Sequence, residues 1–366
     1  MHRTDRGVPG GRMHAHPARA MGRKPSCTGA PVRRESTAAF QDTEDRKVKT
    51  RSLFLAGAVL MVIAAGINAQ QKQSQDLSWA FPQLVAAKEL KPVEDDGKPR
   101  RVPGSDKEYT QKQIDEFFNA PDWFPGEHPP LPKTVQFGKS PRVQACGKCH
   151  LINGQGHPES ASLTGLSAAY MVRQMAELKK DIRKNAEPMN MYAKNLSDEE
   201  VREASEYFAS LKPGVWYKVI EARMVPKTDL NVNYKRLATP DGAMEPIGNR
   251  IISVPEDAFR NESRDPRSGF VAYVPPGSLK KGEDLVKTGG GGRTIACSIC
   301  HGPDLRGLGE VPRIAGQHPI YIVRQLFNFK NGHNGGPWSL LMKAPVSKLT
   351  DEDIVSIAAY VGSLAP

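Results

Sequence analysis

Two segments of the chain repeat apolar residues every three or four positions, which is the period of one face of an α-helix. The apolar positions are Val201, Ala204, Phe208 and Leu211 in the first segment and Ile354, Ile357, Val361 and Leu364 in the second. Ser197 and Thr350 stand just before them, and Glu200 and Asp353 follow at the third helical position. A hydroxyl followed by an acid at this spacing is a capping-box pattern. The pattern therefore predicts two helices that begin after Ser197 and Thr350.

The two helices belong to an internal repeat. Residues 170–174 (YMVRQ) match residues 321–325 (YIVRQ), 151 positions later, and residues 163–165 match 314–316 at the same distance. Residues 196–201 and 349–354, where the two helices begin, are separated by 153 positions instead. A fixed period in the sequence indicates repetition of one structural unit. We therefore expect two copies of one helical domain, which differ by a two-residue insertion or deletion.

The stretch between the copies, residues 213–277, has a different pattern. Residues 215–222, 250–254 and 269–274 are short runs of strand-forming residues bounded by Pro, Asp and Gly. They predict a small β-rich insert. Nothing in it resembles a catalytic triad, a phosphate-binding loop or a dinucleotide fingerprint.

The segment before the first copy, residues 70–135, combines many prolines with aromatic side chains. Within it, residues 111–119 predict a short helix. We expect this segment to wrap the first copy, or else to contact a partner protein.

The first 69 residues read as a leader that carries a signal peptide. Lys47, Lys49 and Arg51 precede an apolar run at 53–67, after which the chain becomes polar. A basic stretch followed by a short apolar one is typical of a secretory signal. The alternative is an uncleaved anchor, which would associate the protein with a membrane. We expect export to the periplasm.

The net positive charge of the chain is smaller when the expected leader is excluded. The whole chain carries 51 Lys and Arg against 40 Asp and Glu. After Ala69 the balance falls to 39 against 35, which is too even for a nucleic-acid-binding protein. Cys27 leaves with the leader, so the mature chain keeps four cysteines.

The four cysteines form two C-x-x-C-H motifs, CGKCH at 146–150 and CSICH at 297–301. This spacing is the attachment signature of c-type haem. Two thiols three positions apart reach the two vinyl groups of one porphyrin, and the adjacent imidazole then binds the iron. Disulfides, a zinc site or a thioredoxin-like motif are the alternatives. The expected attachment residues are Cys146, Cys149, His150, Cys297, Cys300 and His301. The expected cofactors are two covalently attached haem c groups.

A methionine is the expected second iron ligand in each copy. Met189 and Met342 each stand seven positions before the leucine that opens the terminal-helix motif, Leu196 or Leu349. Met191 is the rival in the first copy. Histidines could replace the methionines; the candidates are His157, His318 and His333. The expected iron ligands are His150 with Met189 and His301 with Met342. Two methionine-ligated irons have no vacant position for oxygen or peroxide.

Together, these motifs resemble class I cytochrome c domains in the tandem dihaem arrangement of the c4 and c553-like cytochromes. The resemblance implies a mainly α fold, in which two haem domains, 136–212 and 278–366, flank the β-rich insert 213–277. In that family a proline carbonyl accepts the N–H of the iron-binding histidine, a role that suits Pro312. The first copy departs from this pattern, with Ala161 at the aligned position and Leu151 where the second copy has Gly302.

The resemblance implies single-electron transfer between redox partner proteins, with no small-molecule substrate. We expect an electron carrier rather than an enzyme. Two alternatives stay open. One is a dihaem peroxidase, which needs an open position on one iron. The other is a cytochrome subunit of a larger periplasmic dehydrogenase or oxidase complex.

Overall fold

The computed structural model describes residues 77–81, 90–91, 94–184, 186–231 and 235–366. The expected leader, with its apolar run at 53–67, lies outside these residues. The chain divides into two compact units, Met1–Ser74 and Gln75–Pro366, and every described residue belongs to the second. Within the described part, no helix has the length and apolar character to cross a membrane.

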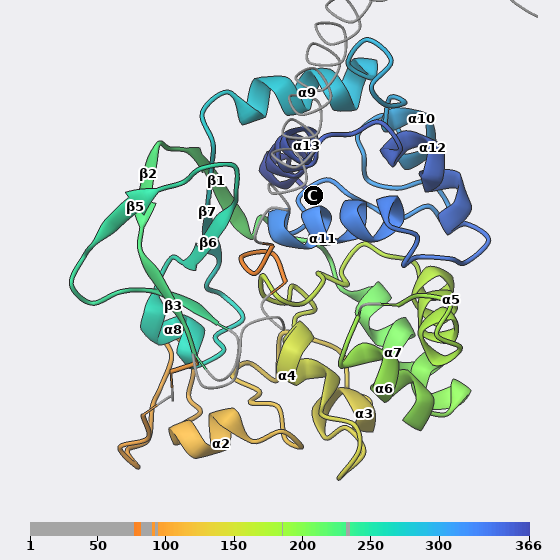
Figure 1. Cartoon of the computed structure of the whole chain (residues 1–366). Coiled ribbons are helices and arrows are strands. Elements are labelled where there is room, and N and C mark those ends of the chain that lie inside the picture. The colour runs from red at the N-terminus through yellow and green to blue at the C-terminus, as the bar shows by residue number, and fades with distance from the viewer. Residues whose placement is uncertain (1–76, 82–89, 92–93, 185, 232–234) are drawn as a thin grey trace, which may run out of the picture. The chain divides into compact units, whose positions relative to one another are not determined.

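The second copy is built from six helical elements (Figure 1). They are α9 (Ser278–Thr288), α10 (Ser298–His301), α11 (Pro319–Lys330), the 3-10 helix η3 (Ser339–Met342), α12 (Lys343–Val346) and α13 (Asp351–Ser363). The first helix, α9, packs against the last, α13, and α13 also contacts α11. Most of α13 is buried, including the predicted face at Ile354, Ile357 and Val361. The core of this copy therefore surrounds its last helix.

Gly282 allows α9 and α13 to approach closely. A Cβ at this position would collide with the backbone oxygen of Ser356 and lie 2.7 Å from the Cβ of Tyr360. Because backbone cannot move aside cheaply, we expect Gly282→Ala to lower the free energy of unfolding by about 3 kcal/mol. Urea unfolding of the haem-loaded protein measures this. Lys280→Ala, on the exposed side of the same helix, is the control, and equal stability of the two variants would contradict the prediction.

The first copy has a shorter opening helix. Its elements are α3 (Lys133–Gln136), α4 (Cys146–His150), α5 (Ala168–Lys179), α6 (Met189–Asn195) and α7 (Asp198–Ser210). Only four residues form α3, whereas α9 of the second copy has eleven. The first copy therefore needs other segments to cover its attachment helix, α4.

Both predicted capping boxes are present. The Ser197 hydroxyl accepts from the Glu200 amide and the Glu200 carboxylate accepts from the Ser197 amide. Thr350 and Asp353 make the same reciprocal pair at the start of α13. The predicted starts of α7 and α13 are confirmed.

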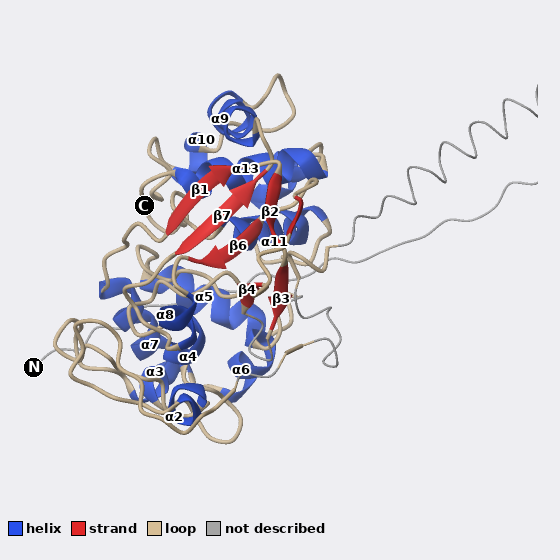
Figure 2. Cartoon of the chain, turned by 90° about the vertical axis from the view of Figure 1, so that its left-hand side faces the viewer, coloured by secondary structure: helices blue, strands red, loops and turns tan. Residues whose placement is uncertain are grey.

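The strands among the described residues lie between Tyr217 and Val274 (Figure 2). They are β1 (Tyr217–Glu221), β2 (Met224–Pro226), β3 (Thr228–Leu230), β4 (Arg236–Ala238), β5 (Met244–Pro246), β6 (Ile252–Pro255) and β7 (Phe270–Val274). Three of them form a sheet in the order β1-β7-β6, in which β1 and β7 run parallel. The predicted runs at 215–222, 250–254 and 269–274 correspond to β1, β6 and β7.

The sheet also contributes to the core of the second copy. Phe270, Ala272 and Val274 of β7 belong to the same buried cluster as α11 and α13, and β1 contacts α13. One helix, α8 (Ala258–Glu262), lies between β6 and β7 and had no clear sequence signal.

The segment before α3 packs on both the first copy and the insert. Its helix α2 (Gln111–Asp115) is shorter than the predicted 111–119, because the backbone turns extended at Glu116 with ψ 128°. Trp123 is buried, and its Nε1 donates to the carbonyl of Ser263 in the insert at 2.8 Å. The carbonyl of Ile114 accepts from Lys148 Nζ in the attachment helix at 2.6 Å.

The two copies meet through equivalent positions. Residues 182–184 pair with residues 333–335, and Arg183 bridges to Asn334, which is its counterpart 151 positions later. Arg183 also donates to Tyr321 and Gln325 of α11, at 3.3 and 3.0 Å. Matching segments of the two copies therefore contact each other at this interface.

Candidate functional site

The first C-x-x-C-H motif opens into a cavity lined largely by apolar side chains of α5, α6 and α7. Cys146, Cys149 and His150 line it from α4, and Met189 lines it from α6. Met191, on the same helix, is 47% exposed. The structure thus brings His150 and Met189 to one cavity.

Helix α11 of the second copy closes part of this cavity. Tyr321, Arg324, Gln325 and Asn328 are among its lining residues. Tyr321, Arg324 and Gln325 belong to the repeated motif at 321–325, but nothing in that motif indicates that they face the site of the other copy.

Both motif histidines are held by backbone carbonyls. His150 Nδ1 lies 2.9 Å from the Ala161 oxygen, and His301 Nδ1 lies 2.8 Å from the Pro312 oxygen. A carbonyl accepts only from N–H, so each Nδ1 carries the proton and each Nε2 keeps its lone pair. Burial lowers the pKa of His150 to about 4 and lowers that of His301, which keeps both rings neutral. Ala161 can take the place of proline because the hydrogen bond to the histidine uses only the backbone carbonyl.

The residue after each histidine has a left-handed backbone. Gly302 has φ 83° and ψ 159°, and Leu151 has φ 60° and ψ 159° at the matching position. Glycine adopts this conformation without steric cost, whereas leucine pays roughly 1 kcal/mol or more. The same turn therefore follows both motifs, although the sequence differs.

None of the four motif cysteines is joined in a disulfide, so both pairs are available for thioether bonds to haem. Burial raises the pKa of Cys146 to about 12 and that of Cys297 to about 11. The first pair lies within α4, whereas Cys297 is the N-cap residue just before α10 and Cys300 lies inside that helix. No group of three or more His, Cys, Asp or Glu side chains in the described ranges is arranged to hold a metal ion directly.

A buried cation at the first cavity also suits haem. Arg183 lines the cavity and donates from Nη1 to Gln174 at 2.8 Å. Its buried Nε has no hydrogen-bond partner among the described residues. A guanidinium whose Nε–H has no acceptor favours an anionic group in the cavity, and haem carries two propionates. The donor set, the paired thiols and this cation all fit the predicted cofactor.

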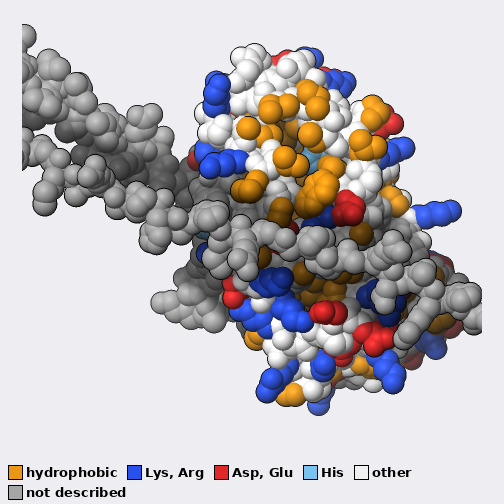
Figure 3. All heavy atoms as spheres, turned by 90° about the vertical axis from the view of Figure 1, so that its right-hand side faces the viewer, with side chains coloured by type: hydrophobic (Ala, Val, Ile, Leu, Met, Phe, Trp, Pro, Cys, Tyr) orange, Lys and Arg blue, Asp and Glu red, His pale blue; other side chains and the backbone are white. Residues whose placement is uncertain are grey.

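The second motif lies on a more open face. Met342 ends η3 and, like Cys297, packs on the edge of the second copy's core. Four large apolar side chains nearby are exposed: Ile299 (70%), Leu308 (65%), Leu340 (62%) and Leu341 (65%). Figure 3 shows hydrophobic side chains gathered on the upper part of this face.

Two of the alternative histidine ligands have other contacts. The ring nitrogens of His318 lie 2.8 and 2.7 Å from the carbonyl oxygens of His157 and Gln155. His157 is within 3.0 Å of Glu159. These contacts join the second copy to the loop that follows the first motif. His333 is half-buried, with Nδ1 3.4 Å from Asn328 Oδ1.

The first attachment helix is covered by buried cations that sequence reasoning missed. Lys148, inside the motif, is only 1% exposed, whereas its counterpart Ile299 is 70% exposed. Arg264 donates from Nη1 to the Lys148 carbonyl at 2.5 Å. Lys235 is also buried and donates to the Asn261 carbonyl at 2.6 Å. Arg264 and Lys235 of the insert thus place positive charge beside the first attachment helix.

Arg313 links the loops behind the two sites. It follows Pro312, whose carbonyl holds His301, and it donates to Thr164 and Ser162, which follow Ala161. The Nη2 distances are 3.0 Å to the Thr164 carbonyl and 3.2 Å to the Ser162 hydroxyl.

Comparison with known proteins agrees with this geometry. The sequence model of the family "Cytochrome c" matches residues 137–212 and 279–365. Cytochrome c-554(548) of Halomonas halodenitrificans is 34% identical over 88 residues, which are 24% of this chain and 96% of that protein.

Longer relatives span both copies. Cytochrome c4 of Stutzerimonas stutzeri is 24% identical over 61% of this chain and 86% of its own length. The thiosulfate dehydrogenase electron acceptor of Thiomonas intermedia is 26% identical over 61% of this chain and 80% of its own length. The chain belongs to the cytochrome c family, as a tandem dihaem class I cytochrome c that carries two covalently bound haem groups and transfers electrons.

Proposed function

We propose that this chain is an exported electron carrier whose irons are bound by His150 with Met189 and by His301 with Met342. Bound haem supplies one-electron Fe(II)/Fe(III) chemistry. Cys146 and Cys149 would attach the first haem, and Cys297 and Cys300 the second. The observation that carries the proposal is that His150 and Met189 line one cavity from two different helices.

Each protein group has a defined task in this proposal. The Ala161 and Pro312 carbonyls orient the imidazoles and would leave each Nε2 available to bind the iron. A neutral thioether favours the reduced iron and raises its potential. Helix α11 excludes water from the first site. The exposed apolar side chains around the second motif would form the transient contact with redox partners.

We expect domain boundaries at 136–212 and 278–366, with the β-rich insert 213–277 between them. The N-terminal segment and the insert cover the first attachment helix, so we assign partner docking to the second site. The signal peptide in residues 1–69 would direct the chain to the periplasm.

Methionine variants test the ligand assignment. In Met189→Ala and Met342→Ala we expect the loss of one methionine–iron charge-transfer band each, a lower potential for the affected haem and a haem open to added ligands. Optical spectra and redox titrations of the purified protein measure this. Met191→Ala is the matched control and should keep both bands; loss of a band in that variant would transfer the assignment to Met191.

A second function is favoured by one relative, which is named an electron acceptor of thiosulfate dehydrogenase. The corresponding role here is a cytochrome subunit of a larger dehydrogenase complex. Co-purification of a catalytic subunit that reduces the tagged chain would support this role. Peroxide turnover by the purified protein would instead indicate an enzyme with a vacant iron position.

A further inference from the structure

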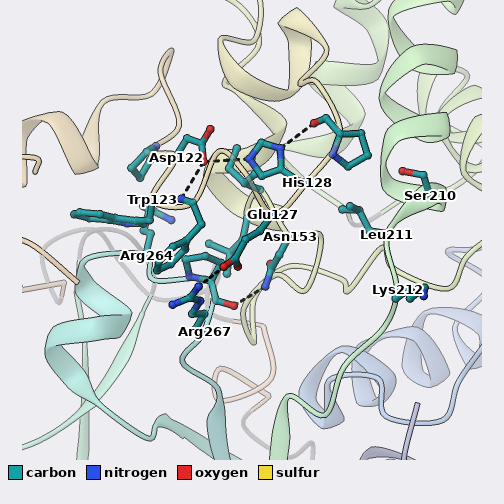
Figure 4. A pocket seen from close by; sticks show the side chains of 17 residues that line it. Asp122, Trp123, Glu127, His128, Asn153, Ser210, Leu211, Lys212, Arg264 and Arg267 are labelled. Atoms are coloured by element: carbon teal, nitrogen blue, oxygen red, sulfur yellow. Dashed lines mark hydrogen bonds and ion pairs between the residues drawn. The ribbon is translucent and has the colours of Figure 1, made fainter. Parts of the chain in front are cut away.

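A second cavity, of about 380 Å³, lies behind the first attachment helix (Figure 4). Its walls come from residues 121–129, residues 147–153, residues 210–212 and residues 264–267. It shares no lining residue with the cavity that holds His150 and Met189. It is therefore a separate site, formed only where the N-terminal segment and the insert meet the first copy.

The carboxylates in this cavity already have partners. Asp122 Oδ1 lies 3.1 Å from His128 Nε2, and Glu127 forms an ion pair with Arg267. Arg267 also covers the ring of Phe124, with its guanidinium carbon 3.5 Å from the ring centroid. These groups form a fixed polar frame that leaves little negative charge for a further cation.

Arg264 is the group in the cavity with unused hydrogen-bonding capacity. It is 6% exposed, and its Nη1 donates to the Lys148 carbonyl. Its buried Nε has no hydrogen-bond partner among the described residues. Lys212, exposed two residues after α7, adds positive charge to the same cavity. A buried guanidinium N–H without a hydrogen-bond acceptor is costly, and an anion in the cavity would supply that acceptor.

Apolar side chains form one part of the wall, beside polar residues that include Asn153 and Ser210. Trp123, Phe124, Ile152 and Leu211 line the cavity and are largely buried. The cavity volume lies within the roughly 300 to 1,000 Å³ that is typical of small-molecule sites. A carboxylate matches the Nε and Nη2 edge of a guanidinium with two parallel hydrogen bonds.

We propose that this cavity binds a small organic carboxylate, with the carboxylate on Arg264 and the apolar body against Trp123 and Ile152. The ligand would lie against the back of α4, close to the first haem attachment site. Its negative charge would stabilise the oxidised iron, so binding would lower the potential of the first haem. Binding itself is independent of the proposed electron-transfer role.

Calorimetry on the haem-loaded protein tests the proposal with benzoate, its neutral analogue benzamide and inorganic phosphate. We expect benzoate to bind one saturable site, with benzamide and phosphate at least roughly tenfold weaker, or about 1.4 kcal/mol. In a redox titration, added benzoate should lower the midpoint potential of the first haem and leave that of the second unchanged. No saturable benzoate binding, or tighter binding of phosphate, would overturn the assignment.

Two variants locate the site. Arg264→Gln should weaken benzoate binding roughly tenfold, and Lys212→Gln should weaken it several-fold. Arg202→Gln, which removes an exposed charge from α7 outside the cavity, is the matched control. If Arg264→Gln fails to fold, Lys212→Gln and the comparison of benzoate with benzamide still test whether the cavity binds a carboxylate. Unchanged affinity in Lys212→Gln and in a folded Arg264→Gln would refute the site.

Discussion

Replacement of Arg313 by methionine is expected to lower the free energy of unfolding by roughly 3 kcal/mol. The side chain is 3% exposed and donates to the Thr164 carbonyl, the Ser162 hydroxyl and the Ala315 carbonyl. Burial lowers its pKa to about 10, so it remains charged at neutral pH. Methionine fills much of the volume but leaves the Thr164 and Ala315 carbonyls without the donor that Arg313 supplies.

Two further arginine-to-methionine variants distinguish the loss of these hydrogen bonds from the general effect of removing an arginine. Arg324→Met removes one donor contact across the interface, from Nη2 to the Pro158 carbonyl at 2.9 Å, and should cost less. Arg202→Met, on the exposed face of α7, should cost almost nothing. Urea unfolding, followed by haem absorbance, gives the three values. A loss for Arg313→Met no greater than that for Arg202→Met would show that the interface does not depend on this guanidinium.

Replacement of Lys235 by methionine is expected to lower the midpoint potential of the first haem and to leave that of the second unchanged. Lys235 is buried and acts electrostatically on Cys149 of the first motif. A positive charge favours the reduced iron, and at roughly 10 Å in an effective dielectric constant of 20 it contributes about 1 to 2 kcal/mol. The expected fall is thus tens of millivolts.

The size of this effect should depend on pH. Burial lowers the pKa of Lys235 well below its usual value. The ammonium is charged below that lowered pKa and neutral above it. The difference between the wild type and the variant should therefore grow as the pH falls. Spectroelectrochemical titration at several pH values measures it, with Lys218→Met, an exposed lysine of β1, as the control. A shift confined to the second haem would contradict the prediction.

The repeat and the motifs predicted the parts of the fold that depend on local sequence. The capping boxes at Ser197 and Thr350 and the strands β1, β6 and β7 fall close to where the pattern placed them. These features carry their own local signal, either a cap residue or a run bounded by turn formers.

Contacts between distant segments left no such signal. Lys148 is buried by Ile114 and Arg264, which are 34 and 116 positions away, and nothing in the motif distinguishes it from the exposed Ile299. The parallel pairing of β1 with β7 likewise joins strands from the two ends of the insert. The methionine loops also differ, since Met189 begins α6 whereas Met342 ends a 3-10 turn.

The order of segments along the chain has a consequence for maturation. Cys146 and Cys149 are synthesised before Arg264, which packs on their helix, and before α11, which closes their cavity. As the chain folds from its N-terminus, the first pair of thiols stays accessible until more than one hundred later residues have followed. Cys300 of the second pair is more exposed than Cys149 of the first. We therefore expect haem attachment to the first pair to precede the packing of the insert and of α11 around it.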